Sequence, residues 1–311
     1  MIGASPNTIS SYRDMFKMMF LFFEQVYQLS PEKITMSHFT RETIQHFLIW
    51  LVESRGNSLS TQNTRLASLK SFIDYLMKVE PDFLYELKEI RAIKAKSYGK
   101  PPMDFLSIDA LTCLLGTPDT STRKGLREAT LLSLMYDTGC RVQELIDLTI
   151  NDIRLSNTST IQLKGKGNKQ RIIPIMTPMS ELLQSYLQQF NCTNHLFLNH
   201  SNLKLSRKGV TYLLQKNVDK AKTLTGIEFP NSVSPHVLRH SKAMHLLRAG
   251  VNLIYIRDFL GHVDIKTTEI YARADSEMKR KALEQSMNLV PSASQPIWQE
   301  DQSLLAWLNS L

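Results

Sequence analysis

Residues 160–175 have the sequence TIQLKGKGNKQRIIPI, in which two short runs containing β-branched residues flank a turn with two glycines. The runs are residues 160–163 and 171–175, and the turn is residues 165–168. Short runs of this kind joined by a glycine-containing turn are typical of a β-hairpin. We therefore predict a small antiparallel sheet at this point of the chain.

The first hundred residues, in contrast, are helical in period. Apolar residues recur every three or four positions in residues 12–27, 44–52 and 66–77. Thr40 and Ser60 are the predicted helix starts, because a hydroxyl oxygen can accept a bond from a free N–H group of the first helical turn. We find no strand-period segment here, so an all-helical N-terminal domain is predicted.

Helical patterns also surround the hairpin. One runs through residues 126–136 and turns at Gly139 into a second, over about residues 140–148. After the hairpin, helices are expected to begin at Met179, Arg207 and His236. The helix at His236 follows a cap-like Ser234 and Pro235 and is expected to end at Gly250. Two short helices are expected over residues 253–260 and 265–271. The predicted fold is mainly α with a small β-sheet, with an α+β second domain.

A break in the pattern separates the two parts of the chain. Residues 93–102 read IKAKSYGKPP, and the lysines, glycine and paired prolines favour an extended linker. We predict a helical domain over residues 1–95, a linker over 96–103, a second domain over 104–290 and a tail over 291–311.

The tail combines a Pro/Ser spacer with one short amphipathic helix that includes Trp307. Such a helix cannot bury its apolar face alone, so it docks on its own domain or on a neighbouring subunit.

The composition is that of a soluble globular protein with room for two cores, since the chain has 311 residues and is 42% hydrophobic. Its formal charge of +8 suits an anionic partner. Cys113, Cys140 and Cys192 are too widely spaced for a metal-ligand pair and indicate no disulfide framework. The apolar stretch over residues 15–26 is too short to cross a bilayer and lacks a cleavage site, so we expect a cytoplasmic protein.

Two local signatures place cations where a phosphate could bind. Residues 138–145 read TGCRVQEL, and a glycine turn brings Arg141 to the positive end of a helix, where its guanidinium can bind two phosphate oxygens. Alternatively, Arg141 is a surface residue paired with Glu144. Lys166 lies between two glycines at the hairpin tip and can reach a DNA groove, or is simply solvated.

Two further signatures follow along the chain. His236 and Arg239 lie three residues apart, so they share one face of a helix near its N-terminus. His240 lies on much the same face and has either a packing or a hydrogen-bonding role. His262 follows Leu260 and Gly261, and Tyr271 comes nine residues later. Taken singly, this histidine and tyrosine could be structural.

Together these residue types suit attack on a phosphodiester. Fixed arginine and imidazole donors stabilise the negative charge that grows on the phosphate oxygens. A tyrosine hydroxyl, with a usual pKa of about 10, needs a cationic pocket or a base to attack at neutral pH. The leaving sugar oxygen needs a proton, which a mobile lysine can donate. The set has no carboxylate cluster able to hold Mg²⁺, so we expect chemistry without a metal or other cofactor.

In this set of residues the chain resembles the tyrosine recombinases, the phage integrase family. The matching residues, in order and in local context, are Arg141, Lys166, His236, Arg239, His262 and Tyr271. The segments around them look like the Xer-type and mobile-element branch. The resemblance covers about residues 104–285 and extends more weakly over residues 1–95, where it implies a helical core-binding domain.

The resemblance implies a role for each residue. Tyr271 would attack the scissile phosphate to leave a 3′-phosphotyrosyl link and a free 5′ hydroxyl, without ATP. Arg141 and Arg239 would hold the non-bridging oxygens and His262 would contact the phosphate. Lys166 would protonate the departing oxygen, and His236 would be the acid/base for the tyrosine.

The resemblance also implies partners. Two domains would wrap DNA as a C-shaped clamp. Strand exchange would pass through a Holliday junction in a homo-oligomer of two to four subunits. This assembly would act on the nucleoid, with or without a related recombinase as a partner. The candidate DNA-binding residues are Gln62, Arg65, Lys70, Lys169, Arg207 and Lys208. We expect integration, excision or transposition of a mobile element. Xer-type chromosome dimer resolution and type IB topoisomerase-like relaxation are the alternatives.

Overall fold

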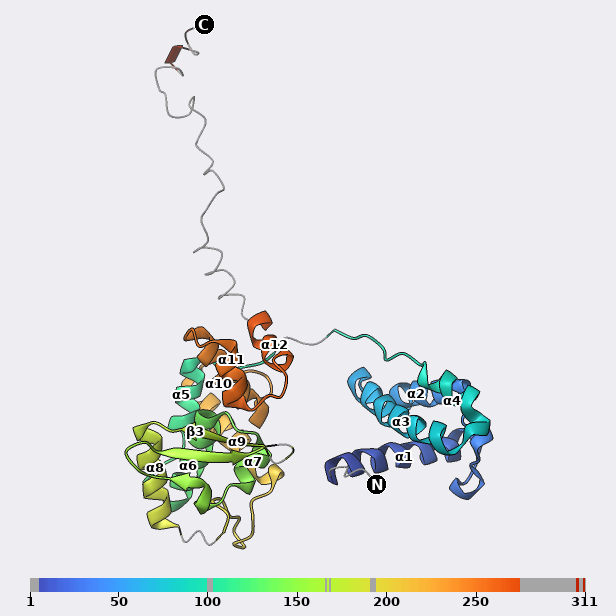
Figure 1. Cartoon of the computed structure of the whole chain (residues 1–311). Coiled ribbons are helices and arrows are strands. Elements are labelled where there is room, and N and C mark those ends of the chain that lie inside the picture. The colour runs from blue at the N-terminus through green and yellow to red at the C-terminus, as the bar shows by residue number, and fades with distance from the viewer. Residues whose placement is uncertain are drawn as a thin grey trace. The chain divides into compact units, whose positions relative to one another are not determined.

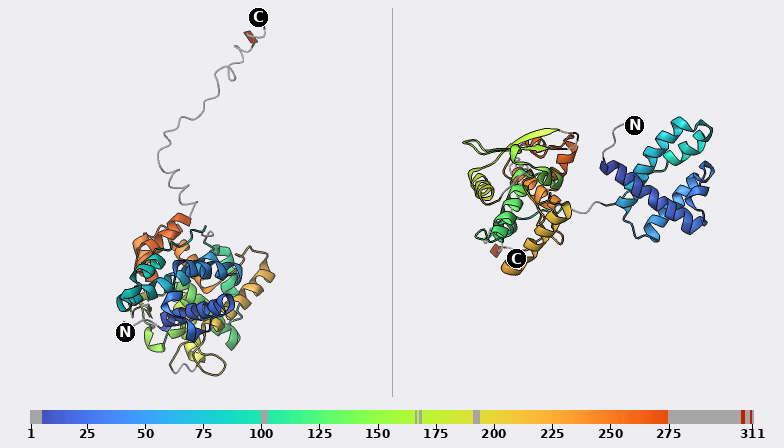
Figure 2. Two further views of the ribbon diagram at one scale, coloured as in Figure 1. Left: turned by 90° about the vertical axis from the view of Figure 1, so that its right-hand side faces the viewer. Right: turned by 90° about the horizontal axis from the view of Figure 1, so that it is seen from below.

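The computed structural model describes residues 6–99, 103–165, 167, 169–190, 194–274, 306, 307 and 310. The chain divides into two compact units, Met1–Pro101 and Pro102–Leu311, which are drawn in Figure 1 and from two further sides in Figure 2. Lys166 lies outside the described residues. So do Cys192 and nearly all of the predicted tail, including most of its expected helix.

The first unit is built from helices, as predicted. They are α1 (Pro6–Tyr27), α2 (Arg41–Glu53), α3 (Leu59–Val79) and α4 (Leu84–Arg91), with the 3₁₀ turns η1 (Pro31–Lys33), η2 (Met36–His38) and η3 (Pro81–Phe83). Their core is rich in aromatic side chains, among which Phe22, Phe47 and Trp50 pack against one another. Large rings let a unit of this size bury enough apolar surface to fold.

The helix starts of the first unit agree with the prediction at one point and differ at another. Thr40 caps α2, because its hydroxyl accepts a bond of 3.1 Å from the N–H of Thr43. Helix α3 begins at Leu59, ahead of the predicted Ser60, because Ser58 is the residue whose side chain accepts from the N–H of Thr61. The short helix α4 was not predicted, since eight residues give little periodic signal.

The second unit is α+β, as predicted. Its helices are α5 (Ile108–Gly116), α6 (Arg123–Thr138), α7 (Val142–Asp147), α8 (Thr177–Gln189), α9 (Arg207–Thr225), α10 (Pro235–Arg248), α11 (Leu253–Leu260) and α12 (Lys266–Ala274), with the 3₁₀ turn η4 (Ile150–Asp152). Its strands are β1 (Ile153–Arg154), β2 (Thr160–Lys164) and β3 (Gln170–Pro174). They form one antiparallel sheet in the order β1-β2-β3. The hairpin is confirmed, and the two-residue strand β1 is an addition too short to predict.

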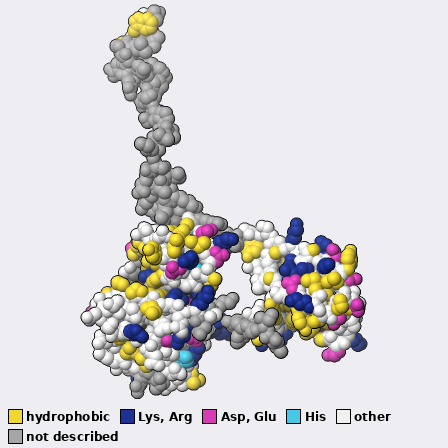
Figure 3. All heavy atoms as spheres, viewed as in Figure 1, with side chains coloured by type: hydrophobic (Ala, Val, Ile, Leu, Met, Phe, Trp, Pro, Cys, Tyr) yellow, Lys and Arg dark blue, Asp and Glu magenta, His cyan; other side chains and the backbone are white. Residues whose placement is uncertain are grey.

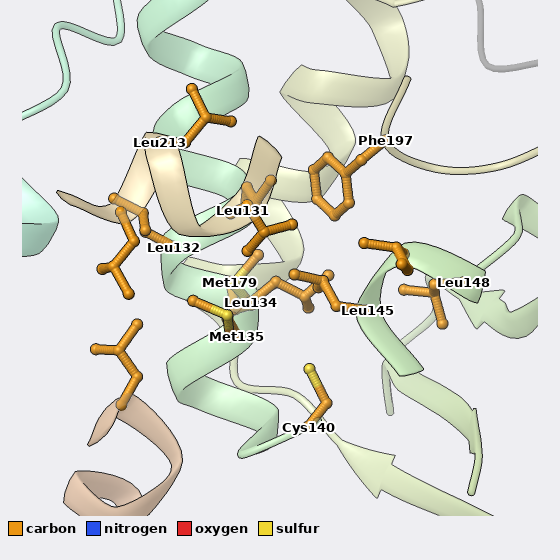
Figure 4. Close-up of a cluster of buried hydrophobic side chains, with 14 of the residues drawn as sticks. Leu131, Leu132, Leu134, Met135, Cys140, Leu145, Leu148, Met179, Phe197 and Leu213 are labelled. Atoms are coloured by element: carbon orange, nitrogen blue, oxygen red, sulfur yellow. The ribbon is translucent and has the colours of Figure 1, made fainter. Parts of the chain in front are cut away.

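Helix α6 is the centre of the second unit. Its side chains Leu131, Leu134 and Met135 are buried, and Figure 4 shows them among Cys140 and Leu145, which come from the turn after α6 and from α7. Cys140 is a free thiol whose burial raises its pKa to about 11, so it stays protonated at neutral pH. The end of α6 and the start of α7 are therefore fixed by the core.

The sheet presents one face to this core. Ile161 of β2 pairs with Ile173 of β3, and both are buried, whereas Ile172 is 67% exposed. In the same register Leu163 pairs with Arg171. Directly paired residues of an antiparallel sheet lie on the same face, so Arg171 points toward the interior together with Leu163.

Helix α10 is held by polar contacts to distant parts of the unit. The hydroxyl of Ser241 accepts a bond of 2.8 Å from the N–H of Leu106. The two ring nitrogens of His245 lie 2.9 Å from the hydroxyl of Tyr136 and 3.0 Å from the carbonyl oxygen of Leu106. Figure 1 shows α10 beside α11 and α12. Residues on these three helices are thus fixed relative to α6.

An ion pair with a buried carboxylate joins α6 to α9. The carboxylate of Glu128, whose side chain is 3% exposed, accepts two bonds from Nζ of Lys216, at 2.7 and 2.9 Å, and one of 2.9 Å from the amide of Asn217. Burial raises the pKa of Glu128, but the bonds from Lys216 and Asn217 and the Lys216 charge together lower it below its ordinary value. The carboxylate therefore stays ionised inside the protein.

We expect Glu128→Gln to lower the free energy of unfolding by about 2 kcal/mol at pH 7, because charged hydrogen bonds are lost in a buried place. The folded pKa of Glu128 is depressed, so its contribution is complete above the unfolded value of 4.5 and is lost as the pH falls through the folded pKa. The difference from wild type, measured by urea denaturation, should shrink below pH 4.5. Asp74→Asn is the control, since its ion pair with Arg91 is exposed and should be worth under about 1 kcal/mol. Equal losses for the two variants would contradict this prediction.

Candidate active site

The five described members of the predicted catalytic set come from four places in the second unit. Arg141 is the residue before α7, His236 and Arg239 lie on α10, His262 follows α11, and Tyr271 lies on α12. Arg141 and Arg239 both act electrostatically on His236, His262 and Tyr271. The structure therefore brings these five side chains together, although Arg141 and Tyr271 are 130 positions apart in the sequence.

A buried carboxylate, that of Glu144, lies beneath this cluster. Its Oε1 accepts bonds from Nη1 of Arg171 at 3.0 Å and from Nη1 of Arg141 at 2.9 Å. Its Oε2 accepts from Nη2 of Arg171 at 2.7 Å and from the backbone N–H of Arg141 at 2.9 Å. Burial raises the pKa of Glu144, but the bonds and charge of Arg171 and the bonds from Arg141 outweigh burial and lower it overall. An ionised carboxylate thus orients both guanidinium groups.

Arg171 was not among the predicted site residues. Besides its paired bonds to Glu144, its Nε donates to the carbonyl oxygen of Phe259 at 2.9 Å, near the end of α11. A Cβ on Gly261 would lie 2.9 Å from Nη1 of Arg171, and φ of Gly261 is +66°, so a glycine is needed there. Arg171 therefore connects the hairpin, the start of α7 and the turn that carries His262. The one sequence feature that could have indicated a buried role for Arg171 is its position opposite Leu163 in the predicted hairpin.

The two predicted arginines are held by carbonyl oxygens at helix ends. Arg239, which is buried, donates from Nη1 to Gly139 at 2.6 Å and from Nη2 to Leu260 at 2.7 Å. Arg141 donates from Nη2 to Gly261 at 3.3 Å. The carbonyl groups at the ends of α6 and α11 need donors and carry partial negative charge, which suits a cation. Burial, followed by the charge of Arg141, lowers the pKa of Arg239 to about 10, so it remains a cation at pH 7.

Tyr271 lies between two imidazole rings. Its side chain is only 1% exposed, and its hydroxyl is 3.0 Å from Nδ1 of His240, not beside His236. The ring of His262 is nearly parallel to the tyrosine ring, at 11°, with the centroids 6.4 Å apart. Nδ1 of His262 lies 2.9 Å from the hydroxyl of Thr268 on α12. Both α10 and the turn after α11 therefore position the tyrosine.

The histidines of the cluster are neutral at physiological pH. Burial and then the charges of Arg239 and Arg141 lower the pKa of His236 and bring that of His262 to about 4. Burial, His236 and Arg239 bring the pKa of His240 to about 4 as well. Burial raises the pKa of Tyr271 more than the two arginines lower it. The cluster thus combines fixed positive charge, neutral imidazoles and a protonated tyrosine, which suits binding of an anion and nucleophilic attack on it.

The candidate DNA-binding residues of the first unit are less exposed than the sequence indicated. Gln62 is 2% exposed and donates from Nε2 to the carbonyl oxygen of Leu48 at 2.6 Å. This burial argues against contact of Gln62 with a base. Gln62 is buried because apolar side chains of α2 and α3 surround it. Arg65 donates to the carbonyl oxygen of Asp14 at 3.3 Å, and Lys70 is half-buried.

The candidates of the second unit are exposed. Lys169, Arg207 and Lys208 reach solvent, and Nε of Arg207 donates to the side chain of Gln143 at 2.6 Å, two residues beyond Arg141. Figure 3 shows clusters of Lys and Arg side chains on the visible face of each unit. The basic charge of the chain is therefore displayed as patches that suit a polyanion.

The described part of the chain has neither a metal-ligand cluster nor a membrane-spanning helix. No group of three or more His, Cys, Asp or Glu side chains there is arranged to hold a metal ion. None of the described helices is both long and apolar enough to cross a membrane.

Comparison with known proteins places the chain in a family. Residues 104–278 match the phage integrase family, and residues 2–80 match the phage integrase N-terminal SAM-like domain. A protein of Sinorhizobium fredii named as integrase/recombinase y4rC is 32% identical over 99% of this chain and 93% of its own length. Tyrosine recombinase XerD of Halalkalibacterium halodurans is 35% identical over 89% of this chain and 90% of its own.

Solved structures agree at the level of the fold. The XerH recombinase bound to a palindromic difH substrate, in a post-cleavage complex, aligns with a TM-score of 0.70 and 24% identity over 89% of this chain and 79% of that one. The Tn1549 transposon integrase in complex with transposon right end DNA aligns with a TM-score of 0.69 and 17% identity over 92% and 95%. This chain belongs to the phage integrase family of tyrosine recombinases, enzymes that break and rejoin DNA.

We expect Arg171→Met to lower the free energy of unfolding by about 3 kcal/mol, because the buried Glu144 loses its paired donor. In the protein that remains folded, DNA cleavage should fall roughly 100-fold, since Arg141 loses its fixed position. Denaturant unfolding and a single-turnover cleavage assay measure the two effects. Arg154→Met, on an exposed position of the same sheet, is the matched control and should change neither value appreciably. Wild-type cleavage by Arg171→Met would show that Arg171 serves stability alone.

Proposed function

We propose that this chain is a site-specific DNA recombinase that breaks each strand with Tyr271 as the nucleophile. One observation carries the proposal: the Tyr271 hydroxyl is hydrogen-bonded within a cluster whose positive charge comes from Arg141 and Arg239. A single tyrosine held beside two fixed guanidinium groups suits attack on one phosphodiester at a time. The exchange of one phosphate ester for another conserves the bond energy, so ATP is not needed.

The proposed step is an in-line displacement at phosphorus. The Tyr271 oxygen forms a bond to the phosphorus while the bond to the 5′ oxygen of the next nucleotide breaks. The products are a 3′-phosphotyrosyl link and a 5′ hydroxyl group. Attack by a 5′ hydroxyl from another strand reverses the chemistry and releases the tyrosine. Two such exchanges, through a Holliday junction, recombine two duplexes.

Arg141 and Arg239 have the proposed role of binding the non-bridging phosphate oxygens. Both have donors held in place before any substrate arrives, and preorganised donors of this kind stabilise developing charge best. His262 and His236 are proposed to donate hydrogen bonds to the same phosphate, His236 from an exposed position at the start of α10. Lys166 is the proposed donor of a proton to the leaving oxygen. Its neighbour Gly165 lies so close to Glu144 that a Cβ there would be 3.2 Å from Oε1.

Both units of the chain are proposed to bind the duplex, closing around it as a clamp. The domains we assign are residues 1–95 for core binding, 96–103 as linker, 104–290 for catalysis and 291–311 as a tail for assembly. The exposed Lys169, Arg207 and Lys208 are the proposed phosphate contacts of the catalytic unit. The working form is a homo-oligomer on DNA, a dimer that pairs into a tetramer, acting in the cytoplasm on the nucleoid. The solved lambda integrase dimer and tetramer on DNA support this proposal by their likeness of fold.

For the biological role we propose integration, excision or transposition of a mobile element. The relative named as integrase/recombinase y4rC, which spans nearly the whole chain, supports this role. Resolution of chromosome dimers, the alternative, would act on one fixed chromosomal site. DNA flanking the gene is therefore the first substrate to test.

Nicked suicide DNA, from which the cut fragment diffuses away, should trap the protein covalently at a DNA 3′ end. We expect the wild type to form this adduct without metal or ATP, and Tyr271→Phe to form none, because only the hydroxyl oxygen can make the phosphotyrosyl bond. Denaturing gel electrophoresis detects the adduct, and Tyr255→Phe, at an exposed tyrosine of α11, is the matched control. An adduct formed by Tyr271→Phe would remove Tyr271 from its proposed role.

A plasmid with two copies of the recognition site distinguishes recombination from simple relaxation. A recombinase should delete or invert the DNA between the copies, because strands are exchanged between paired sites. A topoisomerase-like enzyme would remove supercoils from a plasmid with one site and leave the order of sequences unchanged. Restriction mapping after incubation reads the result. Relaxation without any rearranged product would contradict the proposed exchange.

A further inference from the structure

The proton of the Tyr271 hydroxyl has to leave when the oxygen attacks, and the proposed function leaves its acceptor open. Among the described residues, the hydrogen-bond partner of this hydroxyl is His240, with 3.0 Å between the oxygen and Nδ1. The rings of His240 and Tyr271 have centroids 5.7 Å apart and are inclined by 59°, so they are not stacked, and they meet through the hydroxyl and Nδ1. In the neutral tautomer with its proton on Nε2, Nδ1 of His240 accepts the hydrogen bond from the tyrosine hydroxyl.

His236, which the resemblance suggested for this proton, occupies a different place. It lies one turn before His240 on α10, and the two ring centroids are 6.3 Å apart. His236 is exposed to solvent, and its ring makes no hydrogen bond within the described part of the chain. His240 is half-buried between His236 and the tyrosine. The helix thus presents one imidazole to solvent, where a phosphate arrives, and the next to the nucleophile.

The charges around His240 are suited to an acceptor that works only when substrate is bound. The groups that act on it are His236 and Arg239 on α10, Tyr271 on α12, and His262 in the turn after α11. Burial and then the first two of these bring its pKa to about 4, so the ring is neutral and free to accept. A phosphodiester at Arg141 and Arg239 adds negative charge, which raises the affinity of a nearby imidazole for a proton. Proton transfer would thereby be coupled to occupation of the site.

We propose that His240 is a catalytic residue that accepts the proton of Tyr271. This inference rests on the proposed function. As the bond from the tyrosine oxygen to phosphorus forms and the bond to the 5′ oxygen breaks, the tyrosine proton passes to Nδ1 of His240, while the leaving oxygen takes a separate proton from Lys166. In the rejoining step His240 returns its proton to the departing tyrosine oxygen. No further reactant is required, since the protons balance within the site.

Single-turnover adduct formation on nicked DNA, followed from pH 6 to 9, tests this assignment. In His240→Asn the amide oxygen can still accept a hydrogen bond near the position of Nδ1 but cannot take a proton. We expect its rate at pH 7 to be roughly 100-fold below wild type. The rate should then rise by about tenfold per pH unit, because the tyrosine has to ionise first and its usual pKa is about 10. The wild type should be nearly independent of pH over this range.

Two comparisons separate His240 from the other groups. His236→Asn should lower the rate by a factor that does not change with pH, because this variant removes a phosphate contact only. A substrate with sulfur in place of the 5′ bridging oxygen has a leaving group with a pKa of about 8.5 that needs no proton. This substrate should restore cleavage by Lys166→Ala and should not restore it in His240→Asn. Unchanged thermal unfolding verifies that the variants are folded.

The outcomes are distinct. If the wild type forms the adduct and His240→Asn keeps a flat pH profile, His240 only positions the tyrosine or has no part, and the assignment is wrong. A pH slope acquired by His236→Asn instead would transfer the role to His236. If the wild type forms no adduct with DNA, the proposed function itself fails, whatever the variants do.

Discussion

The arrangement of the site depends on one buried carboxylate. Glu144, whose side chain is 3% exposed, accepts four hydrogen bonds from Arg141 and Arg171. An ionised group in such a place is tolerated only if it is fully paired, so the carboxylate fixes both partners. Through Arg171 it sets the distance between the hairpin and the end of α11. Through Arg141 it sets the start of α7, and the phosphate-binding geometry follows from both.

A second feature is the use of helix ends to hold cations. The carbonyl oxygens of Gly139 and Leu260, at the ends of α6 and α11, take the two terminal nitrogens of Arg239. Carbonyl groups at helix ends have no donor within the helix, and that of Gly139 is held in place by the buried α6. Burial, together with this positive charge, keeps the neighbouring histidines neutral, and the pKa values of His240 and His262 are about 4. The same scaffold therefore supplies both cationic and neutral hydrogen-bonding groups for phosphate chemistry.

The sequence and the structure agree most closely where a signal is local. The hairpin follows from two β-branched runs and a glycine turn, and Thr40 caps α2 because a hydroxyl at that position accepts a backbone bond. Local signals fail where a neighbour distant in sequence decides the outcome. Gln62 looked like an exposed polar residue of a helix, but it is buried against α2, where the carbonyl oxygen of Leu48 accepts a hydrogen bond from its amide. The long amphipathic helices were therefore predictable, whereas the exposure of single polar residues on them was not.

By itself, the sequence determined the mainly helical fold with one small sheet and the family to which the chain belongs. It also supplied the residue types that the chemistry requires, in an order that needs no structure to recognise. The tertiary structure decided which of them touch. The hydroxyl of Tyr271 lies against His240 and not His236, and Arg171 joins the site although it lies on a strand. Contacts between residues 27 or 31 positions apart depend on how helices and strands pack, and residue spacing along the chain carries no record of that packing.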